Sequence, residues 1–67
     1  MAEWKDGSVE STLSIGPWYA RATGIDWAVF LDGVGRVRHG MRDSRSGNKA
    51  AIEVALIELR VLNGGAK

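Results

Sequence analysis

Arginine and aromatic side chains with strand-like spacing are the residues of this sequence best suited to chemistry. Arg36 and Arg38 are two positions apart, which puts both side chains on one face if this segment is a β-strand. Arginine binds phosphate bidentately and aromatic rings stack on bases, so the pattern favours contact with nucleic acid. The alternatives are an acidic protein surface and a solvated sheet face with no target. The residues predicted to make these contacts are Arg21, Arg36, Arg38, Arg42, Arg45, Lys49, Phe30 and Trp27.

The charge distribution supports a local basic surface. The net charge is +1, but residues 35–49 hold five basic residues against Asp43, a local charge of +4. Residues 1–34 hold two basic and five acidic residues, a charge of −3. The basic segment therefore stands out on an otherwise balanced chain.

Other kinds of site are poorly supported. The chain has no cysteine and one histidine, His39, so a zinc site would need three carboxylates around that imidazole. The serines lack a G-x-S-x-G setting, and Gly33-Val34-Gly35 precedes a strand where a phosphate loop would precede a helix. We expect no enzyme activity, no metal and no cofactor.

The element that must position these residues is a helix predicted over Asn48–Leu62. Asn63-Gly64-Gly65 tolerates positive φ and forms a good stop, and Ser46 or Asn48 is a credible N-cap. One stripe at helical spacing would face the core; it consists of Ile52, Ala55, Leu56, Leu59 and Leu62.

A second apolar stripe lies on the far side of the same helix, at i, i+4, i+7 and i+11 spacing. Because a contiguous apolar row favours a partner, we predict a homodimer or a protein partner there. The alternative is that the N-terminal arm folds over the stripe through Trp4. The stripe consists of Ala50, Val54, Ile57 and Val61.

The remaining segments predict a small sheet. The alternation of apolar and polar residues gives strands over Val9–Ile15, Trp18–Thr23, Trp27–Leu31 and Arg36–Met41. Residues 1–8 read as a flexible arm and residues 9–65 as one domain. The fold class is α+β: a small antiparallel β-meander of three to four strands packed by one C-terminal α-helix. No apolar run is long enough for a membrane span, and we expect a cytoplasmic protein.

Two registers of the last hairpin remain open. A two-residue Asp-Gly turn would place Arg36 and Arg38 on the face of Trp27. A three-residue loop over 33–35 would instead place both arginines on the face of Phe30.

The second register is favoured by what it brings together. It pairs Asp32 with Arg36, so opposite charges meet across the hairpin. It also places Val37 and His39 on the face of Trp27, with the other large apolar residues of the hairpin.

Part of the chain resembles a class of DNA-binding domains. The motifs Gly16-Pro17-Trp18-Tyr19-Ala20-Arg21, Asp32-Gly33 with Gly35-Arg36, and Ala50-Ala51 resemble the three-strand-plus-helix domains of the AP2 and integrase arm-binding type. The resemblance implies a sheet lying in the major groove, with Arg21, Arg36 and Arg38 as readers. The stretch 23–31 departs from that pattern by adding a strand.

A second resemblance concerns the opening of a ribonuclease H fold, through Asp6-Gly7-Ser8 followed by strands and a helix with Glu53. Only five residues precede Asp6, and the second half of that fold is missing, so no catalysis is carried over. The sequence thus predicts a non-enzymatic module that binds nucleic acid, DNA before RNA. The alternative is a protein-interaction or inhibitor protein of the phage- or bacterial-accessory type.

Overall fold

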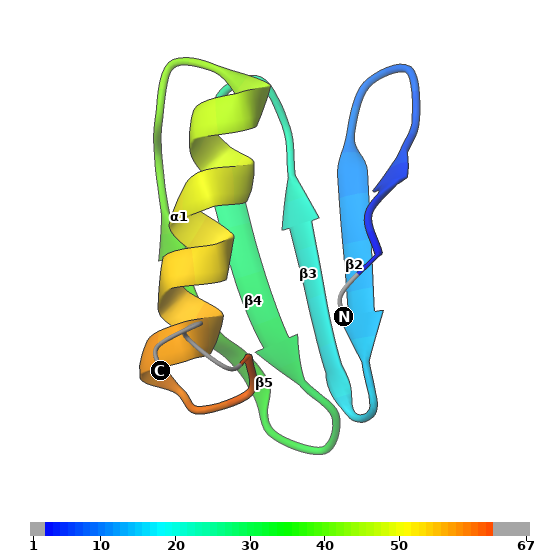
Figure 1. Cartoon of the computed structure of the whole chain (residues 1–67), viewed down its shortest axis with the longest axis vertical. Helices are drawn as coiled ribbons and strands as arrows, with labels where there is room; N and C mark the ends of the chain where they lie inside the picture. The colour runs from blue at the N-terminus through cyan, green and yellow to red at the C-terminus, as the bar shows by residue number, and fades with distance from the viewer. Residues whose placement is uncertain (1–2, 63–67) are drawn as a thin grey trace.

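The computed structural model describes residues 3–62 as a five-stranded antiparallel sheet with one helix packed on one face (Figure 1). The strands are neighbours in chain order, β1-β2-β3-β4-β5. The predicted α+β meander with a C-terminal helix is confirmed, with five strands in place of three to four. The elements are β1 (Lys5–Asp6), β2 (Ser11–Ile15), β3 (Trp18–Ala22), β4 (Trp27–Leu31), β5 (Gly35–Gly40) and α1 (Arg45–Glu58).

The core lies between α1 and the middle strands, as the apolar alternation predicts. Small side chains at Ala20 and Ala22 of β3 allow the helix to approach the sheet closely, and the helix contributes residues of its predicted core stripe. Val9 is 74% exposed, because β2 begins two residues later than predicted. The buried apolar residues are Leu13, Ala20, Ala22, Val29, Ile52, Ala55 and Leu56.

The N-terminal segment lies against the sheet and the helix, where the sequence predicts a loose arm. β1 pairs with β2. Trp4 Nε1 donates to Oε2 of Glu53 at 3.0 Å, and Lys49 Nζ lies 5.1 Å from the centroid of the Trp4 ring. Trp4 therefore docks on the side of α1 that carries Lys49 and Glu53, and it does not cover Val54, which is 54% exposed.

The helix begins three residues earlier and ends four residues earlier than predicted. Its N-cap is Ser44, whose hydroxyl accepts from Gly47 N at 3.0 Å, so both predicted caps were wrong. Arg60 adopts φ 63° and its N–H donates to the Ile57 carbonyl, while Val61 N donates to the Leu56 carbonyl. These two bonds form a Schellman ending with arginine at the left-handed position. The predicted stop at 63–65 lies outside the described residues.

The hairpin of β4 and β5 follows neither predicted register. Leu31 is opposite Gly35, so the loop consists of residues 32–34, with Gly33 and Gly35 at positive φ. Phe30 then pairs with Arg36, but Val29 pairs with Arg38, which leaves one extra residue in β5 as a β-bulge.

The bulge reverses the alternation of β5. Val37 packs against the core, as the favoured register predicts. Arg38 lies opposite the inward-facing Val29, and His39 lies opposite the outward-facing Ala28, so both were assigned to the wrong face. A bulge is stabilised when the extra residue can pack, and the burial of Val37 supplies that contact.

Candidate functional site

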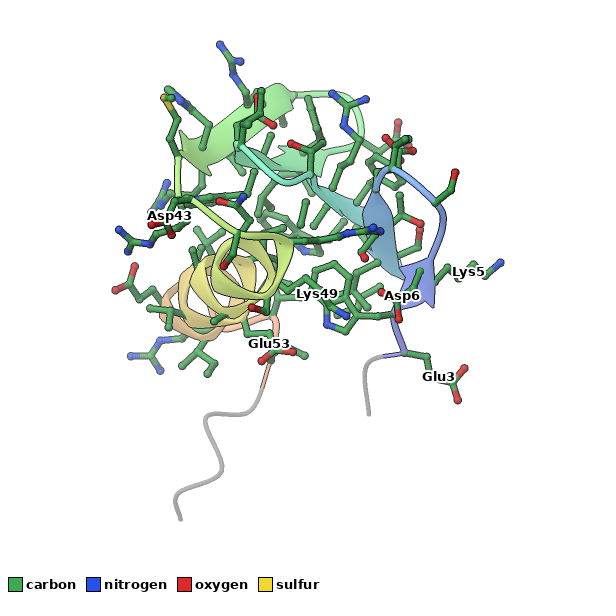
Figure 2. All side chains as sticks on the ribbon, turned by 90° about the horizontal axis from the view of Figure 1, so that it is seen from above. Glu3, Lys5, Asp6, Asp43, Lys49 and Glu53 are labelled. Carbon is green, nitrogen blue, oxygen red and sulfur yellow. The ribbon has the colours of Figure 1, made fainter. Side chains whose placement is uncertain are left out.

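The face of the sheet opposite α1 carries aligned polar, aromatic and basic side chains; we call it the open face. Within residues 3–62 no element covers it (Figure 2). The strand pairing arranges its side chains in two neighbouring rows. The rows are Ser14, Tyr19, Phe30 and Arg36, and Thr12, Arg21, Ala28 and His39.

An aromatic pair lies in the middle of the first row. The ring centroids of Tyr19 and Phe30 are 6.0 Å apart, and the ring planes make an angle of 41°. Tyr19 is 40% exposed. Arg36 is the next residue in the row. Ring surface and guanidinium therefore lie side by side on the open face.

Arg21 and Arg36 make the open face basic. The nearest acidic partner of Arg21 is Glu10, with Nε to Oε1 at 3.8 Å and both side chains well exposed. Such a pair contributes little, so it leaves Arg21 available to a ligand. A depression of about 240 Å³ lies among Arg21, Phe30, Arg36 and His39, and the carboxylate residue Asp26 also lines it.

Three of the predicted contact residues lie on the other side of the sheet. Arg38 lies on the helix side, and its Nη1 donates to the Val37 carbonyl at 3.0 Å. The Trp27 indole packs against the core and covers Gly40, where an added Cβ would stand 2.6 Å from Nε1, although Trp27 also borders the depression on the open face. Together with Arg42 they line a hollow between α1 and β5, described below. The shared basic face predicted for Arg36 and Arg38 was wrong.

Two further predicted contact residues hold the N-terminal loop. Arg45 Nη1 donates to the Gly7 carbonyl at 2.6 Å, and Nη2 donates to the Ser8 carbonyl at 3.1 Å. Lys49 Nζ lies 2.9 Å from Oδ1 of Asp6, and Figure 2 shows these two side chains meeting. Because both cations are engaged within the chain and lie away from the open face, we assign them a structural role.

The Asp6 carboxylate is the centre of this loop attachment. The Ser11 hydroxyl and then the Lys49 ammonium donate to Oδ1, which lowers the pKa of Asp6 below its ordinary value of 3.8. The folded state therefore binds fewer protons at this carboxyl than the unfolded state. Its contribution to stability is present above about pH 4 and is lost as pH falls through the lowered pKa.

We expect Asp6→Asn to lower stability at pH 7 and to reduce the stability change between pH 5 and pH 2. The amide keeps the shape of the carboxylate but removes its charge, so both donors lose a charged acceptor. Urea denaturation across this pH range measures the effect, with Asp43→Asn as the matched control, because Asp43 is exposed. Parallel pH curves for Asp6→Asn and the wild type would contradict the assigned role.

The hollow between α1 and β5, called the groove from here on, holds much of the second helix stripe. Its volume is about 420 Å³. Ala50 and Val54 belong to both the stripe and the groove, whereas Ile57, 41% exposed, belongs to the stripe alone. Val61 lies beyond the end of α1 and packs against the core, so it is not part of an exposed stripe.

Five residues of the open face are missing from the predicted contact set: Thr12, Ser14, Tyr19, Ala28 and His39. Strand alternation is sufficient to place Tyr19 on the face of Arg21, so its position is predictable from the sequence. His39 reaches this face through the bulge, for which the sequence carries no clear signal.

Comparison with protein-family models, with curated proteins and with solved structures finds no match to this chain. Among residues 3–62, no three His, Cys, Asp or Glu side chains are grouped to hold a metal ion. Over the same residues, the helix is too short and too polar to cross a membrane.

Proposed function

We propose that this chain is a non-enzymatic module that binds nucleic acid, DNA in the first instance, through the open face. The observation that carries the proposal is the alignment of Tyr19, Phe30 and Arg36 on adjacent strands of an uncovered sheet, with Arg21 in the neighbouring row.

Each part of the open face has a chemical role in this proposal. The rings of Tyr19 and Phe30 stack on bases, which favours unpaired bases over an intact duplex. Arg21 and Arg36 contact phosphates, and the depression beside Phe30 lies between them. Arg38 and Arg42 make no contact in this arrangement, because they face the groove.

Two arginines of the same strand provide a matched test. Arg36→Glu is expected to weaken binding of a single-stranded DNA oligonucleotide by tenfold or more, because a charge-assisted contact contributes about 1.5–3 kcal/mol. Arg38→Glu carries the same charge change on the opposite face and is expected to have a much smaller effect. Fluorescence anisotropy at low salt measures both variants, together with duplex DNA and RNA as competitors.

The salt dependence gives a second readout of the same contact. Binding should weaken as salt rises. Arg36→Glu should reduce the slope of the logarithm of the binding constant against the logarithm of salt concentration by the amount expected for about one phosphate contact. Equal losses for Arg36→Glu and Arg38→Glu would mean that net charge alone attracts the oligonucleotide. No binding at low salt would exclude the proposal.

A protein-interaction or inhibitor role is the second candidate, and the exposure of Val54 and Ile57 on α1 favours it. This candidate predicts that Val54→Asp abolishes binding of the protein partner, whereas Arg36→Glu leaves that binding unchanged.

A further inference from the structure

The helix wall of the groove is apolar between two oppositely charged ends, and Arg38 lies on the opposite wall, formed by β5. Its helix wall runs from Gly47 to Glu58, with Ala50, Ala51 and Val54 between them. The stem of Arg42 lies over Gly47, since a Cβ added at Gly47 would stand 3.3 Å from Cβ of Arg42. One end is therefore cationic and the other is anionic.

The residues between the ends suit close packing of a second helix. Gly47, Ala50 and Ala51 are small, and Val54 is 54% exposed, so a helix can approach with Val54 as the projecting contact. Helices that pack in this way lie 8–10 Å apart, with small residues giving the shorter distances. The wall thus has both the shape and the apolar surface of a helix-packing site.

The order of charges identifies the occupant. If a second α1 lies antiparallel across the middle of the wall, Gly47 of one copy comes opposite Glu58 of the other. Arg42 of each copy then meets Glu58 of its partner, which gives two ion pairs in the dimer. The antiparallel helix dipoles also attract each other. A twofold dimer therefore satisfies both charged ends with one interaction.

We propose that the groove is occupied by a second copy of this chain, which packs antiparallel along α1. α1 lies on the opposite side of the sheet from the open face (Figure 2), so the proposed dimer leaves both open faces uncovered. The inference goes beyond the proposed function and does not depend on it.

The dimer is expected to be weak. A standard interface buries roughly 800 Å² per partner, and one side of a 14-residue helix offers less than that. We expect a micromolar dissociation constant, so the oligomeric state should be followed by sedimentation and light scattering up to high protein concentration.

The first test uses one substitution at two places. Val54→Asp puts a charge in the middle of the contact and is expected to raise the dissociation constant by about tenfold or more. Val34→Asp, in the exposed β4–β5 loop, is the matched control and should dimerise like the wild type. A monomeric wild type at high concentration, or a Val54→Asp variant that dimerises normally, would overturn the proposal.

The second test reverses the charge pair. Arg42→Glu and Glu58→Arg should each weaken dimerisation several-fold, whereas the double variant should restore it, because the pair is reconstituted in the opposite sense. Failure of the double variant to recover would rule out the antiparallel arrangement. Oligonucleotide anisotropy on the same samples reads the open face separately, so loss of the dimer and loss of nucleic-acid binding are distinguishable.

Discussion

Asn48→Asp is expected to lower the free energy of unfolding by about 3 kcal/mol or more at neutral pH. Asn48 is fully buried in the first turns of α1, and its Nδ2 donates to the Thr23 carbonyl at 2.7 Å. Within residues 3–62 its Oδ1 has no hydrogen-bond partner. A carboxylate at this position would be desolvated and would face the Thr23 carbonyl with an oxygen in place of a donor.

The pH dependence of this variant has a definite sign. Burial raises the pKa of the new carboxyl in the folded state, and the protonated acid can donate to the Thr23 carbonyl as the amide does. The folded state then binds more protons at this carboxyl than the unfolded state. The destabilisation relative to the wild type is therefore smallest below about pH 4 and grows as pH rises toward the raised pKa. Chemical denaturation between pH 3 and pH 8 measures this slope.

Asn48→Ala serves as the control for charge. It removes the same hydrogen bond and leaves the Thr23 carbonyl unpaired, which lowers the free energy of unfolding by about 1–3 kcal/mol. It introduces no titrating group. If Asn48→Asp were as stable as the wild type at pH 7, water would have to reach this position and the described burial would be incorrect.

Leu56→Ala is expected to destabilise the domain by about 3 kcal/mol, within the 2–5 kcal/mol found for buried leucines. Leu56 is 1% exposed and packs in the core, and its carbonyl accepts from Val61 and Leu62 in the turn that ends α1. Removing the side chain leaves a cavity beneath that turn. It also removes the apolar contact that accompanies a Schellman ending.

The size of the domain makes this loss severe. Stabilities of about 0.05–0.15 kcal/mol per residue correspond to roughly 3–10 kcal/mol for 67 residues. Ile57→Ala, the next residue along α1 and 41% exposed, is the matched control and should cost well under half as much. Equal losses at Leu56 and Ile57, by urea denaturation, would contradict the assignment of the two helix faces.

The structure divides the predicted basic surface into three parts with different roles. Arg21 and Arg36 remain on the open face, Arg38 and Arg42 line the groove, and Arg45 with Lys49 holds the N-terminal loop. This division changes which variants are informative. A double substitution of Arg36 and Arg38 would confuse two surfaces, whereas the single variants separate them.

Local patterns in the sequence were sufficient to predict β2 to β5 and α1, but not β1, which lies in the predicted arm. The period-two alternation from Leu13 to Ala22 and the helical spacing of Ile52, Ala55 and Leu56 each report one buried face, and the structure buries those faces. The α+β meander follows from these elements and their short connections. The outward positions of Arg21 and Phe30 also follow from alternation, whereas the face of Arg36 depends on the hairpin register, which alternation leaves open.

Tertiary contacts decided the rest. The bulge in β5 forms only if the packing of Val37 on the core stabilises the chain more than the interrupted β4–β5 hydrogen bonds destabilise it. The spacing of residues in the sequence does not report this balance. The contacts of Arg45 with Gly7 and of Lys49 with Asp6 join residues about 40 positions apart, so no local period reports them. The sequence alone therefore identified the basic residues and the exposed helix residues Ala50, Val54 and Ile57. Only the folded chain determined that Val61 packs inward and which arginines share a face.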